Sequence, residues 1–174
     1  MLRNYLKVNS ASMEMEELKA KLEELHPANF RWALSCCRWD RLEAEDVLQN
    51  AYLKILQGKA RFDGNSTLKT WMFSVVRRTA AEQRRRNAIH SALLLRFFTD
   101  RQRSPSRHDV RETPLKSILG ELPFRQRQVL ELVFYEDMTI EQAAAILEIA
   151  PGTARTHYER GKKLLRQKLQ GAKV

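Results

Sequence analysis

The chain carries TIEQAAAILE at residues 139–148 and, three residues later, GTARTHYER at residues 152–160. Thr139 followed by Gln142 fits a capping box, the reciprocal side-chain and backbone pairing that marks the start of a helix. Pro151 is suited to the first turn of a second helix. The apolar residues between these signals recur at helical spacing, and they are Ile140, Ala143, Ala144 and Leu147. Two helices joined by a short turn are therefore predicted here.

The second of these helices is predicted to have two chemically different faces. At about 100° per residue, one side holds Ala154, Tyr158, Gly161 and Leu165. The opposite side holds Arg155, Thr156, Glu159 and Arg160. Guanidinium, hydroxyl and carboxylate groups can read base edges in a major groove, and the following Lys163 is suited to phosphate. The pattern indicates a DNA-binding helix-turn-helix; an ordinary amphipathic helix with a solvated face is the alternative.

Charge is concentrated in one part of the chain. The formal net charge is +10 over 174 residues, but residues 77–111 alone carry ten arginines against three acidic side chains. Such a block favours a polyanionic partner, and nucleic acid in particular. Solvated helix faces would explain scattered lysines better than an arginine cluster.

Helical periodicity also accounts for the first hundred residues. It predicts helices over about 15–25, 28–38 and 43–57, the second with Phe30, Ala33, Leu34 and Cys37 inward, and a long helix from Leu68. Gly58 is placed as a C-cap. Residues 88–98 either extend the long helix or fold back on the domain, and the apolar stretch 93–98 is either buried or a docking surface. No alternating strand pattern is present.

The predicted fold class is all-α, with two small helical domains joined by a flexible linker. Residues 1–12 are expected to form a loose tail, residues 13–99 the first domain and residues 114–174 the second. Residues 100–113 are rich in Ser, Pro and Arg and are typical of a linker. No apolar run is long enough for a membrane span and no signal peptide is evident, so a cytoplasmic protein without membrane insertion is expected.

Two features of the first domain are candidate sites. The acidic residues Glu43, Glu45 and Asp46 open the third helix, where they either stabilise the helix dipole or face a basic partner. Residues 62–67 (FDGNST) form a polar loop beside Trp71, Arg77 and Arg78, a combination suited to single-stranded nucleic acid. Trp71 taken alone favours a core position.

Catalytic and metal chemistry is not indicated. Cys36 and Cys37 are adjacent, a poor geometry for a mutual disulfide, and they are expected to pack inside a helix. The four histidines are scattered, and no zinc spacing, phosphate-binding glycine loop or nucleophile–base pair is found. No cofactor and no enzymatic activity are expected.

Several motifs together resemble the extracytoplasmic-function (ECF, group IV) sigma factors of the sigma-70 family. They are EAEDVLQ at residues 43–49, FDGNS at 62–66, TWMF at 70–73, LP at 122–123 and GTAR at 152–155, in the family's order. The resemblance spans residues from about 13 to 170. It implies a dissociable subunit of bacterial RNA polymerase that brings the core enzyme to promoters.

The resemblance also implies roles for individual residues. Glu45, Asp46, Leu48 and Gln49 would contact the β′ clamp of core RNA polymerase. Phe62, Asp63, Gly64, Asn65, Ser66, Thr67 and Leu68, with Trp71, Arg77 and Arg78, would bind the −10 strand. Arg155, Thr156, Glu159, Arg160 and Lys163 would bind the −35 duplex, while the second domain contacts the β flap. An anti-sigma factor is a further partner of such proteins. The alternative function is a free-standing helix-turn-helix regulator.

Overall fold

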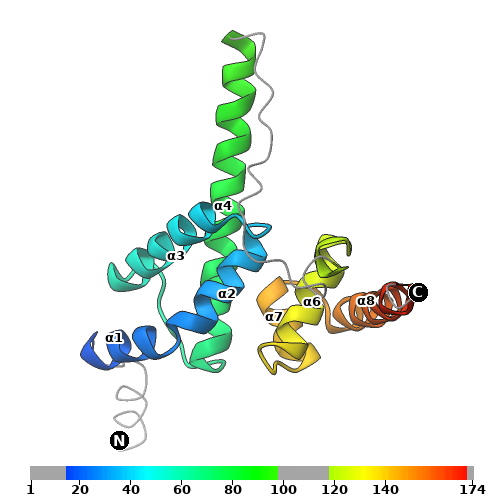
Figure 1. Cartoon of the computed structure of the whole chain (residues 1–174). Helices are drawn as coiled ribbons and strands as arrows, with labels where there is room; N and C mark the ends of the chain where they lie inside the picture. The colour runs from blue at the N-terminus through cyan, green and yellow to red at the C-terminus, as the bar shows by residue number, and fades with distance from the viewer. Residues whose placement is uncertain (1–14, 98–117, 172–174) are drawn as a thin grey trace, which may run out of the picture. The chain divides into compact units, whose positions relative to one another are not determined.

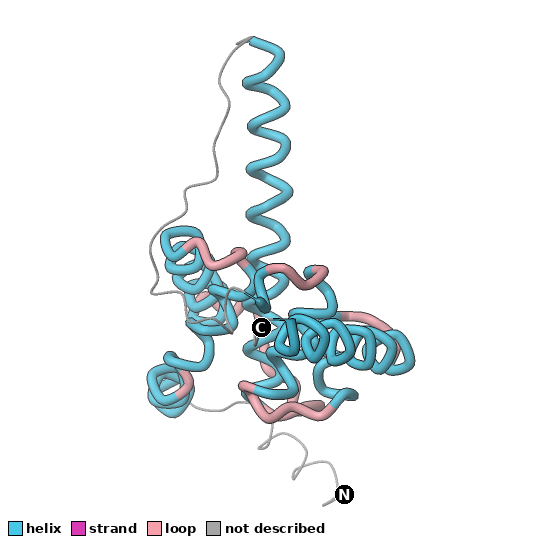
Figure 2. The backbone as a smooth tube through the Cα atoms, turned by 45° about the vertical axis from the view of Figure 1, so that its right-hand side comes forward, coloured by secondary structure: helices cyan, strands magenta, loops and turns pink. Residues whose placement is uncertain are grey.

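The computed structural model describes residues 15–97 and 118–171, and the chain divides into two compact units, Met1–Ser106 and Arg107–Val174. Within the described residues all regular structure is helical, as Figure 2 shows. The predicted all-α fold is therefore confirmed. The predicted tail 1–12 and linker 100–113 lie outside the described residues.

Residues 15–97 of the first unit form four helices, which Figure 1 labels. They are α1 (Met15–Glu24), α2 (His26–Cys36), α3 (Arg41–Leu56) and α4 (Leu68–Phe97). Asp40 caps α3 by accepting a hydrogen bond from the Glu43 backbone N–H at 3.0 Å. Gly58 follows the end of α3 with φ of +67°, the left-handed conformation that makes glycine the favoured residue after a helix.

The core of the first unit is centred on α2, which packs against both α3 and α4. Trp32 stacks on Phe73 of α4 with ring centroids 5.7 Å apart, and its indole N–H donates to the Phe73 carbonyl at 2.9 Å. Because α2 lies between two helices, it buries more than one stripe. Trp32 is therefore buried, whereas Phe30 and Leu34, predicted to point inward, are only half-buried.

Helix α4 is continuous from Leu68 to Phe97, so residues 88–97 extend the long helix and do not fold back. Figure 1 shows its C-terminal part projecting past α2 and α3. The side chains of residues 85–90 are accordingly exposed. The side chains of the apolar stretch 93–98 lie outside the described residues.

The second unit contains α6 (Phe124–Phe134), α7 (Ile140–Leu147) and α8 (Pro151–Gly171). The predicted capping box is present, with Thr139 and Gln142 exchanging hydrogen bonds of 2.8 and 3.1 Å at the start of α7. Gly161 lets α8 approach α6 closely, because a Cβ at this position would lie 3.0 Å from Leu130 Cδ1 and 3.2 Å from Gln126 Cβ. This unit therefore positions α7 and α8 as a helix-turn-helix pair.

Candidate nucleic-acid and polymerase interfaces

Helix α8 has the two faces that its sequence predicts. Ala154 and Gly161 are buried, and Tyr158 and Leu165 are half-buried against the unit. The four residues of the opposite face are all exposed, and they are Arg155, Thr156, Glu159 and Arg160. This second helix of the motif therefore presents a polar surface of the kind that enters a major groove.

The polar side chains of α8 are held to different degrees. Thr156 Oγ1 donates to the Gly152 carbonyl at 2.9 Å, so its hydroxyl keeps acceptor capacity toward solvent. Arg155 pairs with Glu141 of α7 at 3.5 Å, and Glu159 pairs with Lys162 at 3.0 Å. Within residues 15–97 and 118–171, Arg160 forms no ion pair. The face thus combines restrained groups with a cation that is available for a ligand.

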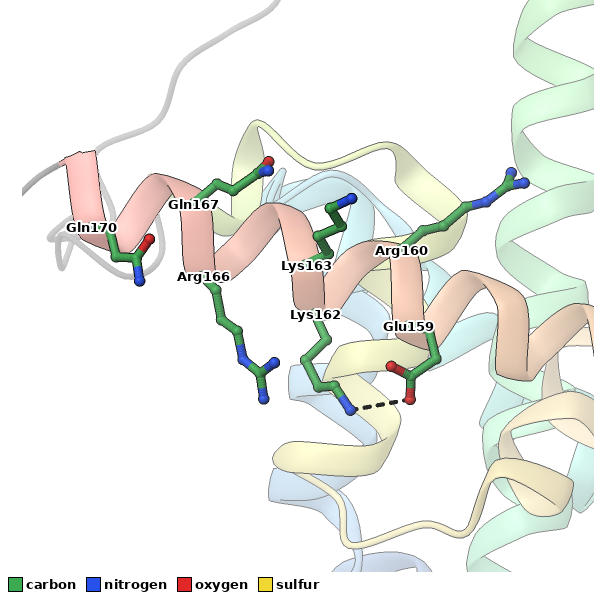
Figure 3. Close-up of a pocket in the computed structure, with 7 residues that line it drawn as sticks. All are labelled: Glu159, Arg160, Lys162, Lys163, Arg166, Gln167 and Gln170. Atoms are coloured by element: carbon green, nitrogen blue, oxygen red, sulfur yellow. Dashed lines mark hydrogen bonds and ion pairs between the residues drawn. The ribbon is translucent and has the colours of Figure 1, made fainter.

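Farther along α8, seven side chains line an open hollow on the helix surface (Figure 3). They are Glu159, Arg160, Lys162, Lys163, Arg166, Gln167 and Gln170. In Figure 3, Arg160, Lys163 and Gln167 point to one side of the helix, and Glu159, Lys162 and Arg166 to the other. The surplus of cations over the single carboxylate favours an anionic ligand such as a phosphate backbone.

The predicted loop at residues 62–67 is built around two local structures. The Phe62 ring lies on Trp71, with centroids 5.4 Å apart, and anchors the base of the loop. At the tip, Asp63 accepts hydrogen bonds from the Asn65 backbone N–H at 3.1 Å and from its side-chain amide at 2.7 Å. These hydrogen bonds hold the pKa of Asp63 below its usual range, so the carboxylate that shapes the turn stays ionised.

The rest of this loop is open and joins directly to α4. Residues 63–67 are exposed, and Gly64 at φ of +74° would meet no neighbouring atom if it carried a Cβ. Thr67 Oγ1 accepts from the Thr70 backbone N–H at 3.2 Å and so caps α4, which begins at Leu68. Because the ends of the loop are anchored and its tip is exposed, the loop can bind a ligand while it keeps its own conformation.

The aromatic and basic candidates on α4 lie in different environments. Trp71 is half-buried. It is therefore neither a fully buried core residue nor a freely accessible platform for base stacking. Arg77 is also half-buried, and Arg78 is exposed. Arg78 is thus the more accessible of the two arginines, while the exposed part of Trp71 is limited by its contact with Phe62.

Helix α3 presents one exposed stripe that sequence reasoning identified only in part. Glu45 is half-buried and pairs with Arg41 at 2.8 Å, while Asp46 and Gln49 are exposed. Leu42 and Leu53 are 62% and 51% exposed and continue the same stripe. The spacing 42, 46, 49 and 53 follows one helix face, and this spacing is the sequence signal that would have found both leucines.

Leu48 does not belong to this stripe. Its side chain is only 3% exposed and packs in the core of the first unit with Val47 and Ala51. Because α3 buries positions 44, 47, 48, 51 and 55, Leu48 faces the domain interior. The candidate partner surface on α3 therefore excludes Leu48.

The second unit also carries an apolar groove away from the polar face of α8. It is lined by Leu119, Leu130, Phe134, Tyr135 and Leu165. Phe134 and Tyr135 remain 55% and 52% exposed. Large apolar side chains that stay exposed at a groove mark a site for another apolar surface.

The cysteines, the potential metal ligands and the helix lengths bear on other kinds of chemistry. Cys36 and Cys37 are buried, and burial raises the pKa of the Cys37 thiol, so the expected packing role of both is confirmed. In the part of the chain that the structure describes, no group of three potential metal ligands gathers. No described helix is long and apolar enough to cross a membrane.

Two protein-family models match the chain, one to each unit. The model for sigma-70 region 2 matches residues 22–89, and the model for sigma-70 region 4 matches residues 113–165. The first match contains α3, the loop and most of α4. The second contains the helix-turn-helix and ends within α8.

Individual relatives give the same picture. The chain is 28% identical over 141 residues to the ECF RNA polymerase sigma factor SigX of Bacillus subtilis, covering 75% of this chain and 73% of that protein. It is 26% identical over 173 residues to the ECF RNA polymerase sigma factor SigL of Mycobacterium tuberculosis, covering 92% and 93%. Its fold is similar to that of the sigma factor RpoE of Bartonella quintana, solved in complex with the anti-sigma factor NepR, with a TM-score of 0.72, 24% identity and coverage of 90% and 98%.

Proposed function

The chain belongs to the sigma-70 family as an ECF-type RNA polymerase sigma factor, and from this premise we propose how its two units recruit polymerase to a promoter. One observation carries the proposal. The regions matched by the region 2 and region 4 models each present an exposed polar face, on α3 with its following loop and on α8. We assign the chain to group IV and its domains to residues 13–99 and 114–174.

The second unit reads the −35 element as duplex DNA. In this proposal α8 enters the major groove, Arg155 and Arg160 recognise guanine, and Thr156 and Glu159 contact neighbouring base edges. Lys163 then contacts phosphate and fixes the register of the helix. The exposure of all five side chains supports this assignment.

Replacing Arg160 by alanine is expected to weaken recognition of the −35 element by about 1–3 kcal/mol, because a bidentate contact with one base pair is lost. Holoenzyme affinity should be measured on promoter duplexes carrying each of the four bases at every −35 position. The loss of base discrimination in Arg160→Ala should be confined to one −35 position. In the matched variant Lys163→Ala, affinity should fall uniformly over all sequences and the salt dependence should decrease by about one phosphate contact. If Arg160→Ala instead lowers affinity equally for all −35 sequences, Arg160 does not read a base.

The first unit holds the melted −10 strand. The loop from Phe62 to Leu68 would receive a base at its open tip, and the arginines of α4 would follow the strand backbone. The anchoring of Phe62 on Trp71 and the Asp63–Asn65 turn support a preformed loop. A preformed loop binds with a smaller loss of conformational entropy than a disordered one.

Core polymerase binds through a mixed stripe of leucines and polar side chains on α3 and through an apolar groove on the second unit. The stripe on α3, formed by Leu42, Glu45, Asp46, Gln49 and Leu53, faces the β′ clamp. The apolar groove on the second unit receives the β flap. The α3 assignment rests on exposed leucines next to polar side chains, the composition expected of an interface core with a polar rim. The groove assignment rests on the exposed aromatic side chains that line it.

The double variant Asp46→Ala with Gln49→Ala is expected to weaken binding to core polymerase by about tenfold, because two polar contacts of the interface are lost together and a residue at the centre of an interface can contribute about 1 kcal/mol. Both side chains are exposed, so the unfolding midpoint should not change. Affinity for core enzyme can be measured by fluorescence anisotropy of the labelled full chain.

The matched control is Glu17→Ala, which removes an exposed carboxylate from α1, outside the residues that match region 2. It should bind core polymerase like the unmodified chain. Retention of full affinity by the α3 double variant would show that this stripe does not face the clamp.

A free-standing helix-turn-helix regulator is not favoured, because the first unit matches a sigma region. In this proposal the chain acts through polymerase, in the cytoplasm where polymerase works. It performs no chemistry of its own. The relative from Bartonella quintana was solved with an anti-sigma factor. Anti-sigma control is likewise proposed for this chain.

A further inference from the structure

Glu141 is the one acidic side chain of α7 that reaches the DNA-facing side of α8. Its Oε1 lies 3.5 Å from Nη2 of Arg155. Both side chains remain about two-thirds exposed, at 62% for Glu141 and 67% for Arg155. Sequence reasoning selected Arg155 but not its partner, since the two are 14 positions apart on different helices.

The backbone around Glu141 is well fixed. Glu141 lies in the first turn of α7, directly after the Thr139 capping box. Ala143 and Ala144 are buried, and these small side chains allow α7 and α8 to pack closely. The carboxylate therefore projects from a backbone position that the capping box and the helix packing fix.

Stability does not explain this ion pair. Exposed pairs typically contribute little to folding, because water screens them and two side chains lose rotamer freedom. A guanidinium that has already lost part of that freedom, however, loses less when it binds DNA. The pair therefore affects how Arg155 binds more than how the unit folds.

The geometry leaves the guanidinium able to read a base. The contact uses one Nη2 group, and an arginine side chain has five N–H donors. The remaining donors can form the two parallel hydrogen bonds that guanine accepts at O6 and N7. When DNA covers the site, the lower local dielectric strengthens the attraction between Glu141 and Arg155.

Arg160 provides the contrast within the same face. It forms no ion pair with any residue in the described parts of the chain, and the nearby Glu159 is paired with Lys162. Of the two arginines assigned to base reading, Arg155 is thus the one held from the neighbouring helix.

We propose that Glu141 is a positioning residue for Arg155, and that through it the first helix of the motif contributes to −35 sequence specificity. This inference rests on the proposed function of α8. It predicts that Glu141 sharpens the preference for guanine at one base pair without itself touching a base.

The test compares holoenzyme binding to promoter duplexes that vary at each −35 position, for the unmodified chain and for Arg155→Ala, Glu141→Gln and the double variant. Arg155→Ala identifies the base pair concerned. Glu141→Gln should reduce discrimination at that base pair by about two- to fivefold, the range expected from an ion pair of this kind. In the double variant, the loss of base discrimination should equal the loss in Arg155→Ala alone, because the two residues act through one contact with the base.

The control variant is Asp137→Asn, which removes an exposed negative charge from the same unit and keeps a residue that tolerates the left-handed backbone at φ of 54°. It measures the uniform gain in affinity caused by less repulsion of DNA. If Glu141→Gln produces only such a uniform gain, the inference is overturned while the role of Arg155 stands. If Arg155→Ala changes no base preference, the assignment of α8 residues in the proposed function fails, and the inference fails with it.

Discussion

Trp32→Ala is expected to lower the free energy of unfolding of the first unit by about 3–5 kcal/mol, the usual cost of removing a large buried aromatic side chain. The indole is 2% exposed, stacks on Phe73 and donates to its carbonyl at 2.9 Å. The substitution leaves a cavity between α2 and α4 and removes the hydrogen bond that the indole donates to α4. Urea denaturation of the full chain provides the measurement.

The chain offers a convenient reporter for this experiment. Its three tryptophans, Trp32, Trp39 and Trp71, all lie in the first unit, so fluorescence of the remaining two follows that unit alone. Trp32→Phe is the graded control, because it keeps a ring against Phe73 and loses the hydrogen bond, at a cost of about 1–2 kcal/mol. An unchanged fluorescence midpoint in Trp32→Ala would show that this contact does not organise the core.

Gly161→Leu is expected to destabilise the second unit by about 3 kcal/mol or more, at the upper end of the range for overpacked interiors. Even a Cβ would lie 3.0 Å from Leu130 and 3.2 Å from the Cβ of Gln126, which is close to the α6 backbone and cannot move aside easily. A unit of this size has only about 3–8 kcal/mol of stability to lose. Binding to the −35 element should be lost with the fold.

Circular dichroism and fluorescence together test this second prediction. Thermal melting should show early loss of part of the helical signal, while the tryptophan transition of the first unit keeps its midpoint. Gly152→Ala is the matched control, since a Cβ there would meet no atom within 4 Å and the residue lies in the first turn of α8. If Gly161→Leu melts like Gly152→Ala, α6 and α8 do not pack as closely as the structure has them.

Local signals predicted most of the fold. The capping box at Thr139, the helix end before Gly58 and the long helix from Leu68 depend on neighbouring residues, and all three are present. The inward face of α2 was only partly predicted, since periodicity assumes burial on one side whereas α2 packs against two helices. Leu48 shows the same limit, because a motif position does not say which way its side chain points.

The candidate sites divide in a similar way. The exposed face of α8 could be predicted from helix geometry alone, because the angular positions of residues around one helix depend only on their spacing in the sequence. The pairing of Arg155 with Glu141, and of Phe62 with Trp71, depends on how separate segments pack, and no local pattern encodes it. Contacts of this kind decide how a site works and require the tertiary structure.

The proposed role of this chain is to confer promoter specificity on RNA polymerase. Run-off transcription by core polymerase, with and without the full chain, on a pool of genomic promoter fragments tests it most directly. Discrete start sites, preceded by shared −10 and −35 sequences, should appear only when the protein is present. Binding to duplex DNA without any new start site would contradict this role.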